Sequence, residues 1–166
     1  MTEEDRLEVQ AINDEMASEG YRILAVSCSG PKDDTLMLLG LAIMYDPPKD
    51  GVFEAVRDCH RAGIKITVVT GDYSKTALSI AQQTGIAEDQ YVIITGEELR
   101  RLNKGELAKK IDTDCPVIFA RTTPQDKLKI VTAYQSLGHV VAATGDGIND
   151  VLALKKAGFG ISMGKN

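Results

Sequence analysis

The chain contains no tryptophan, only three cysteines and no excess of positive charge. The cysteines, Cys28, Cys59 and Cys115, are far apart and odd in number, so they predict neither a disulfide framework nor a Cys-x-x-Cys zinc site. With 19 Lys and Arg against 24 Asp and Glu, the net charge is −5, which argues against nucleic acid as a partner. The longest apolar stretch, Leu36 to Tyr45, has about half the length of a membrane-spanning helix. The composition therefore predicts a soluble chain in a reducing, cytosolic setting.

A pair of prolines divides the 166 residues into two parts. A predicted helix and two predicted strands precede the prolines, over residues 3–19, 22–28 and 36–44. The prolines of Asp46-Pro47-Pro48-Lys49 stiffen the backbone and prevent a helix or sheet from continuing. We therefore expect a domain boundary here, with residues 1–45 and residues 46–166 on its two sides.

Beyond the prolines, short β-rich runs alternate with amphipathic helical patterns. The predicted strands are residues 64–69, 91–94, 117–120, 140–143 and 159–163. This alternation is typical of an α/β domain with a mainly parallel, Rossmann-like sheet flanked by helices. In such sheets ligands bind outside the carboxyl ends of the strands. The polar residues that follow the strands are therefore the candidates for a functional site.

The most informative of these polar segments is Thr144-Gly145-Asp146-Gly147-Ile148-Asn149-Asp150. The glycines allow a tight turn, and Asp146 and Asp150 offer the hard oxygen ligands that Mg²⁺ prefers, usually together with substrate phosphate oxygens. The same residues also fit an ordinary turn in which Asn149 or Asp150 caps a helix.

Two further segments follow other strands. Thr70-Gly71-Asp72 places a hydroxyl group before a helix N-terminus, where it can hold a phosphate oxygen or simply cap the turn. Arg121-Thr122-Thr123-Pro124 opens a helix, with Thr123 as the predicted cap and Pro124 in the first turn. Lys127, one turn further on, can neutralise a phosphate or be a solvated surface lysine. Together the three segments supply most of a phosphoryl-transfer site, but no nucleophile.

These segments resemble the P-type cation-transporting ATPases, whose phosphorylation domain has the haloacid dehalogenase-like fold. The resemblance covers essentially the whole chain and leans toward the type II pumps. It rests on four motifs in the family's order: the hinge motif Asp46-Pro47-Pro48-Lys49, Thr70-Gly71-Asp72, the lysine motif from Phe119 to Lys127, and the Mg²⁺ loop from Thr144 to Asp150.

The resemblance implies a role for each matching residue. It implies Mg²⁺ as cofactor, with Asp146 and Asp150 as the metal residues, and ATP as substrate. The catalytic residues that it implies are Thr70, Lys127 and Asp150. The residues that it places at the nucleotide are Arg22, Leu24, Thr70, Gly71, Asp72, Arg121, Lys127 and Asn149. It also implies that residues 1–45 are the last part of an α+β nucleotide-binding domain, and that residues 46–166 are an incomplete phosphorylation domain.

Several departures from the family pattern matter. The Asp-Lys-Thr-Gly-Thr phosphorylation motif is absent from this sequence, and a phosphoenzyme needs its carboxylate. Leu152 and Gly158 replace a usual proline and aspartate, and Lys49 stands where arginine is common. We therefore expect a fragment from the cytosolic face of a membrane pump, inactive alone. Its expected partners are ATP and the pump's actuator, nucleotide-binding and transmembrane parts. A sheet that lacks the strand leading to the nucleophile also predicts edge-to-edge self-association.

Two other interpretations remain open from the sequence. A soluble haloacid dehalogenase-like phosphatase would use Asp46 as its nucleophile, since Asp46 follows an apolar strand. Two prolines come next, however, and no second acid lies two residues on to protonate a leaving group. A non-catalytic module that binds Mg²⁺ and nucleotide for regulation fits the missing nucleophile equally well.

Overall fold

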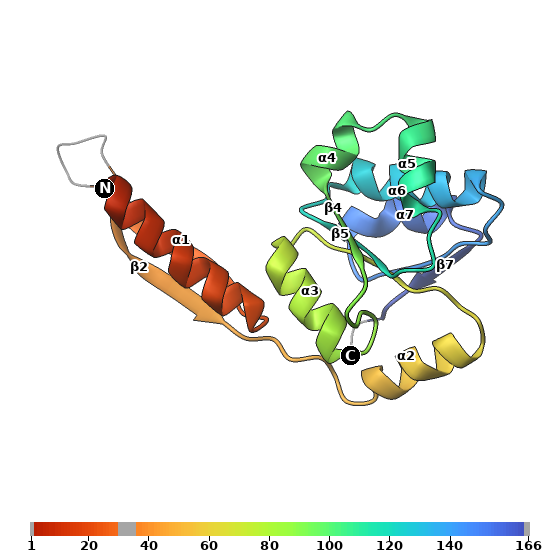
Figure 1. The fold of residues 1–166 in the computed structure, drawn as a ribbon, viewed down its shortest axis with the longest axis horizontal. Coiled ribbons are helices and arrows are strands. Elements are labelled where there is room, and N and C mark those ends of the chain that lie inside the picture. The colour runs from red at the N-terminus through yellow and green to blue at the C-terminus, as the bar shows by residue number, and fades with distance from the viewer. Residues whose placement is uncertain (1, 30–35, 165–166) are drawn as a thin grey trace.

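The computed structural model describes residues 2–29 and 36–164 and divides into two units (Figure 1). An N-terminal unit consists of α1 (Glu3–Ser18) and a hairpin of β1 (Arg22–Ser29) and β2 (Leu36–Met44). The other elements form a larger sheet unit, and the chain passes between the two units through residues 45–51. No helix in the two described stretches is both long and apolar enough to cross a membrane.

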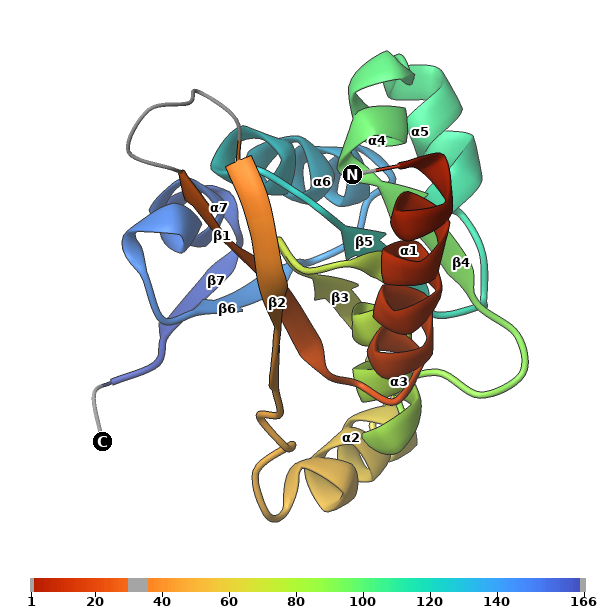
Figure 2. The same cartoon turned by 90° about the vertical axis from the view of Figure 1, so that its left-hand side faces the viewer.

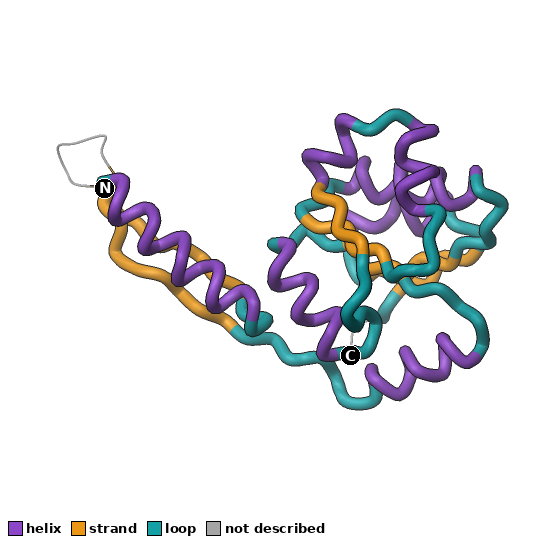
Figure 3. Tube along the Cα trace, in the orientation of Figure 1, coloured by secondary structure: helices purple, strands orange, loops and turns teal. Residues whose placement is uncertain are grey.

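Local signals explain the N-terminal unit. Thr2 and Asp5 form a capping box that starts α1, and Gly20, with φ of +93°, reverses the chain after the helix ends. β1 and β2 pair antiparallel from Arg22 opposite Met44, with a bulge between Val26 and Ser27. The helix lies along the hairpin (Figure 3).

The sheet unit alternates strands with helices, as the sequence predicts. Its strands are β3 (Thr67–Val69), β4 (Val92–Thr95), β5 (Val117–Ala120), β6 (Ala142–Gly145) and β7 (Phe159–Ser162). Its helices are α2 (Val52–Arg61), α3 (Ser74–Gln83), α4 (Gly96–Arg101), α5 (Lys104–Ile111), α6 (Pro124–Ser136) and α7 (Val151–Lys156), with a 3-10 turn at Ile148–Asp150. The predicted α/β class is confirmed.

The strands do not form one continuous sheet. β3, β5 and β4 pair in that order, all parallel, and β6 pairs in parallel only with β7 (Figure 2). In the described chain no backbone pairing joins β3 to β6. Within the described residues, the expected parallel strands thus form two sheets, and the unpaired edges of β3 and β6 face each other.

Strand lengths differ from the prediction near these edges. The apolar run at 64–69 forms a strand only over β3, and the run at 140–143 pairs two residues later, so that Thr144 and Gly145 belong to β6. The hydrophobic pattern shows which residues can be buried, but backbone pairing determines where a strand ends. Among the residues that the structure describes, β3 and β6 each pair with a strand on one side only.

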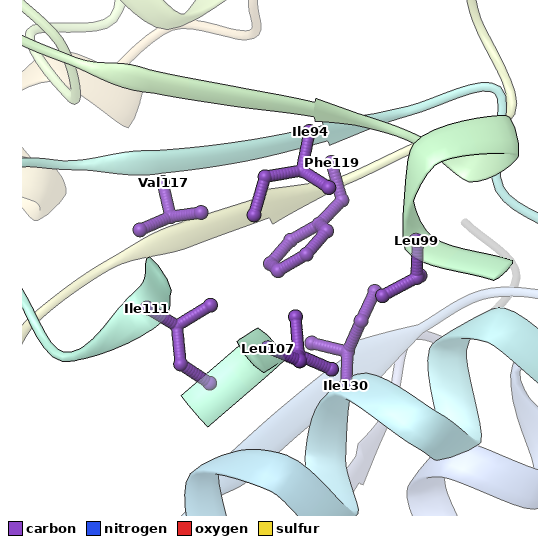
Figure 4. Close-up of a cluster of buried hydrophobic side chains, with 7 residues drawn as sticks. All are labelled: Ile94, Leu99, Leu107, Ile111, Val117, Phe119 and Ile130. Atoms are coloured by element: carbon purple, nitrogen blue, oxygen red, sulfur yellow. The ribbon is translucent and has the colours of Figure 1, made fainter. Parts of the chain in front are cut away.

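The main core lies between the three-stranded sheet and helices α4, α5 and α6. Phe119 of β5 is fully buried there, and the seven buried side chains point toward one another in Figure 4: Ile94, Leu99, Leu107, Ile111, Val117, Phe119 and Ile130. A second cluster, centred on Ile118 and Ala120, packs the opposite face of β5 against α3. β5 is thus buried on both faces, as the central strand of a parallel sheet requires.

We predict that Phe119→Ala lowers the free energy of unfolding by about 3–5 kcal/mol, because it leaves a cavity in this core. Phe159→Ala is the matched control: Phe159 of β7 is 64% exposed, so the loss should stay below about 1 kcal/mol. Urea unfolding of both variants measures the difference. Equal losses would contradict the assignment of the core.

Candidate functional site

The loops that follow β3 and β5 are joined by backbone hydrogen bonds. Thr70 donates its N–H to the carbonyl oxygen of Phe119 at 2.9 Å, and Thr122 donates both its N–H and its hydroxyl to the carbonyl oxygen of Thr70. Arg121 donates its N–H to the carbonyl oxygen of Asp72 at 3.0 Å. Because β3 and β5 are parallel neighbours, their carboxyl ends bring these two predicted segments together.

The hydroxyl group of Thr70 is engaged within its own loop. Its Oγ1 donates to Oδ2 of Asp72 at 2.9 Å and accepts the N–H of Asp72 at 3.1 Å. This is the turn that the sequence left as one of two possibilities for Thr70-Gly71-Asp72. Gly71 and Asp72 are exposed at the tip of the loop, and a ligand there would have to compete for the Thr70 hydroxyl.

Arg121 has an unusual backbone and a defined side-chain position. Its φ of +53° lies in the left-handed region, which is uncommon for a residue with a side chain. Its guanidinium lies 4.9 Å from the ring centre of Tyr73, the residue after the Thr70-Gly71-Asp72 segment. The cation–π contact and the bond to Asp72 hold Arg121 against the β3 loop.

Helix α6 brings Lys127 to the loop after β6, which contains Asp146 and Asp150. The predicted cap is confirmed: Thr123 and Asp126 form a capping box, and Pro124 is the first helical residue. One turn into the helix, Nζ of Lys127 donates to Oδ1 of Asp150 at 2.6 Å. The two side chains are only 19% and 13% exposed, so this ion pair is largely shielded from water.

The ion pair determines the electrostatics of the Asp150 carboxylate. The hydrogen bond from Lys127 lowers the pKa of Asp150, and the N–H groups of Gly147 and Asp146 add to the effect, while partial burial opposes it. Gly145 makes this approach possible, since a Cβ there would lie 2.3 Å from Cβ of Asp150. Asp146 and Asn149 are exposed in the same loop.

A cavity of about 1020 Å³ lies between the unpaired edges of β3 and β6. Its walls include Thr67 and Val69 on one side, Ala142 to Thr144 on the other, and part of α6. Lys127 and Asp150 both line it. Thr70 and Asp146 do not; they follow Val69 by one residue and Thr144 by two.

The predicted residues are therefore brought together only in part. Contacts connect Thr70, Asp72 and Arg121 in one group, and Lys127 with Asp150 in another. Arg22 and Leu24 lie on β1, both exposed, and within the described stretches no hydrogen bond or ion pair links Arg22 to either group.

The loop after β6 carries two carboxylates, Asp146 and Asp150, of the type that Mg²⁺ prefers as ligands. In the described part of the chain no group of three or more His, Cys, Asp or Glu is placed to hold a metal. Mg²⁺ commonly uses one or two carboxylates and completes its shell with water and phosphate. Asp146 and Asp150 supply two carboxylates in one loop, and among the described residues they form no self-contained metal centre.

Two residues important to the site carried signals that were not used in the prediction. Tyr73 directly follows a predicted functional loop, and an aromatic ring beside an arginine-bearing loop is a candidate stacking partner. Asp126 is 4% exposed and accepts from the N–H and hydroxyl of Thr123 and from Arg100. Thr-Pro-Gln-Asp has the capping-box spacing that reveals its role.

We predict that Lys127→Met lowers the free energy of unfolding by about 3 kcal/mol, because it leaves the shielded Asp150 carboxylate without its partner. Lys65→Met is the control, since the Lys65–Asp114 pair is 63% and 100% exposed and should contribute less than about 1 kcal/mol. Denaturant unfolding measures both, and indistinguishable losses would argue against a structural role for the Lys127–Asp150 pair.

Curated relatives are similar over nearly the whole chain. A cation-transporting ATPase, pma1, of Synechocystis sp. is 40% identical over 97% of this chain and 19% of its own length. The human calcium-transporting ATPase type 2C member 2 is 43% identical over 90% of this chain and 16% of its own. A calcium-transporting ATPase of Bacillus subtilis is 38% identical, with coverages of 97% and 19%. The chain thus spans about a fifth of the length of these relatives, and its resemblance to cation-transporting ATPases is confirmed.

A family model agrees with the fold. The model for haloacid dehalogenase-like hydrolases matches residues 4–158, which include every strand except the last and all three loops of the candidate site. The chain therefore belongs to the haloacid dehalogenase-like hydrolase family.

Proposed function

We propose that this chain is a phosphorylation-domain portion of an ATP-driven, cation-transporting P-type ATPase. In the whole protein, ATP would phosphorylate an aspartate that lies outside this chain, and hydrolysis of the aspartyl phosphate would be coupled to ion transport. The four ordered motifs and the ATPase relatives support this proposal. The extent of the match, about a fifth of each relative, supports a part rather than a whole.

The observation that carries the proposal is the position of the Lys127–Asp150 pair in the cavity between β3 and β6. A lysine here can offset the charge of a transferring phosphoryl group, since such transfer depends on positioning and electrostatic stabilisation. Asp146 and Asp150 would hold Mg²⁺, which when bound would offset further phosphate charge. Thr70 would hold a phosphoryl oxygen after giving up its bond to Asp72, and Gly71, Asp72, Arg121 and Asn149 would line the nucleotide.

The unpaired edges of β3 and β6 support the proposal that another segment of the same protein supplies the nucleophile. Within the described stretches, β3 and β6 each lack a partner on the side that faces the cavity, and each runs parallel to its other neighbour. A further parallel strand between them would end beside Lys127, where an aspartate is required. In the isolated chain the same edges favour association with a second copy.

The exposed apolar surface of β7 and of the hairpin supports the proposal that other parts of the pump cover this chain. All four residues of β7 are exposed, including Ile161 at 51%, whereas parallel strands are normally covered on both faces. Leu36, Met37 and Leu39 of the hairpin are 60–73% exposed. We propose that the remainder of a nucleotide-binding domain covers the hairpin, with Arg22 and Leu24 reaching ATP. The actuator and membrane parts would be further partners, with this chain at the cytosolic face.

The test is phosphoenzyme formation in the longer protein that contains this chain. Lys127→Met should reduce labelling by γ-³²P-ATP at least about 100-fold, because it removes a charge that stabilises the transition state. Lys65→Met should leave labelling unchanged. Normal labelling in Lys127→Met would refute the proposal.

The isolated chain should not hydrolyse acyl phosphates through Asp46. Asp46 is exposed in the segment between β2 and α2 and does not line the cavity that holds Lys127. An acetyl phosphate assay with Asp46→Asn as the comparison measures this. Turnover that depends on Asp46 would favour the phosphatase interpretation instead.

Mg²⁺ should bind the isolated chain weakly, since two carboxylates without phosphate form only part of its shell. Asp146→Asn should abolish this binding, whereas Asp114→Asn, which removes a carboxylate paired with Lys65, should not. Isothermal titration with MgCl₂ compares the variants. Identical curves for the parent and Asp146→Asn would count against the assignment of Asp146.

A further inference from the structure

The two units of the chain touch through the helices α1 and α3. Residues 45–51 form the covalent connection, in which Gly51 has φ of +82° and no atom within 4 Å of the place where a Cβ would be. Pro47 and Pro48 keep the segment extended before this point. Rotation at Gly51 would move residues 2–45 as a body, so the contact between α1 and α3 decides where they lie.

Asp14 of α1 makes the central contacts of this interface. Its Oδ2 accepts from Nζ of Lys75 at 2.8 Å, and its Oδ1 accepts from the hydroxyl of Tyr73 at 2.9 Å. These two bonds hold the pKa of Asp14 at about 2, so the carboxylate is charged at neutral pH. We call this group of three contacting residues the latch: Asp14, Tyr73 and Lys75.

Further contacts fix the register of the two helices. Oγ1 of Thr76 donates to the carbonyl oxygen of Tyr21 at 3.0 Å, directly before β1. Nε2 of Gln83 donates to the carbonyl oxygen of Glu19 at 3.4 Å, and a Cβ at Gly20 would lie 3.0 Å from the same nitrogen. Docking through α3 therefore sets the position at which the strand carrying Arg22 and Leu24 begins.

The interface has the properties of one that can open. Asp14 and Lys75 remain 32% and 45% exposed, and partly exposed ion pairs contribute little net stability. The helices also leave an open cavity of about 440 Å³ between them, which is lined by Asp14, Glu15, Ser18, Lys75, Leu78, Ser79 and Gln82. Polar, incompletely packed contacts are typical of domain interfaces that move.

Tyr73 belongs both to the latch and to the candidate site. Its hydroxyl bonds Asp14, and its ring lies under the guanidinium of Arg121. We propose that the latch is a reversible contact that docks residues 2–45 on the sheet unit, and that Tyr73 makes the position of Arg121 depend on whether the latch is closed. Tyr73 is thus a positioning residue for Arg121. The inference stands on contacts between α1, α3 and the β5 loop, and it requires neither ATP nor phosphoryl transfer.

The docking part is tested by pulsed electron–electron distance measurements on the 166-residue chain. Spin labels on Cys28 of β1 and Cys115, with Cys59→Ser, report the distance between the two units. The parent should give one narrow distribution, and Asp14→Ala should broaden it or add a longer component. The charge swap Asp14→Lys with Lys75→Asp should restore the narrow distribution. Glu97→Gln, which breaks an exposed ion pair within α4, is the control and should have no effect.

The coupling part is tested by the ¹⁵N relaxation of the Arg121 Nε–H group. Asp14→Ala does not touch Arg121, yet it should increase the mobility of its guanidinium. Tyr73→Phe keeps the ring and the Asp14–Lys75 ion pair but loses the bond to Asp14, so it should mobilise Arg121 while the distance distribution stays narrow. Tyr73→Leu should mobilise Arg121 further. An unchanged distance distribution in Asp14→Ala would overturn the latch, and an unchanged Arg121 signal with an opened interface would overturn the coupling.

Discussion

The ion pair between Lys127 and Asp150 connects parts of the sheet unit that the backbone leaves separate. No strand pairing joins the β3–β5–β4 sheet to the β6–β7 sheet within the described residues. Helix α6 bridges them instead: Ile130 packs into the core beneath β5, Lys127 binds the loop after β6, and Gln135 donates to the carbonyl oxygen of Lys156 in α7. The geometry of the candidate site therefore depends on this one helix and its polar contacts with the second sheet.

The same arrangement explains why the site is only partly assembled. Loops after paired strands, β3 and β5, are held together by backbone hydrogen bonds that fix Thr70, Thr122 and Arg121. The loop after β6 belongs to another sheet and is connected to the rest through side chains. The hydroxyl of Thr70 is hydrogen-bonded within its own turn, and the ammonium group of Lys127 is paired with the carboxylate of Asp150. Under the proposed function, a phosphoryl group bound by Thr70 and Lys127 would have to replace both internal partners.

Sequence patterns predicted the elements and the α/β class because periodicity and turn residues act locally. The capping box at Thr123 and the continuous apolar run of β5 are examples in which local and tertiary preferences agree. The division of these strands into two parallel sheets could not be predicted, because strand pairing depends on which segments are available as neighbours. The roles of Asp146, Asn149, Arg22 and Leu24 rest on the family resemblance and stay predictions. The contact of Tyr73 with Asp14 joins two residues that are 59 positions apart in sequence, and no local pattern indicates it.

We infer that the edges of β3 and β6 pair with a strand from elsewhere in the same protein. Amide hydrogen exchange measures this most directly, since unpaired edge amides exchange quickly and paired ones are protected. In the longer protein, peptides covering β3 and β6 should exchange far more slowly than in the isolated chain, while β5, already paired on both sides, should change least. Equal exchange of β3 and β6 in the two forms would contradict the account.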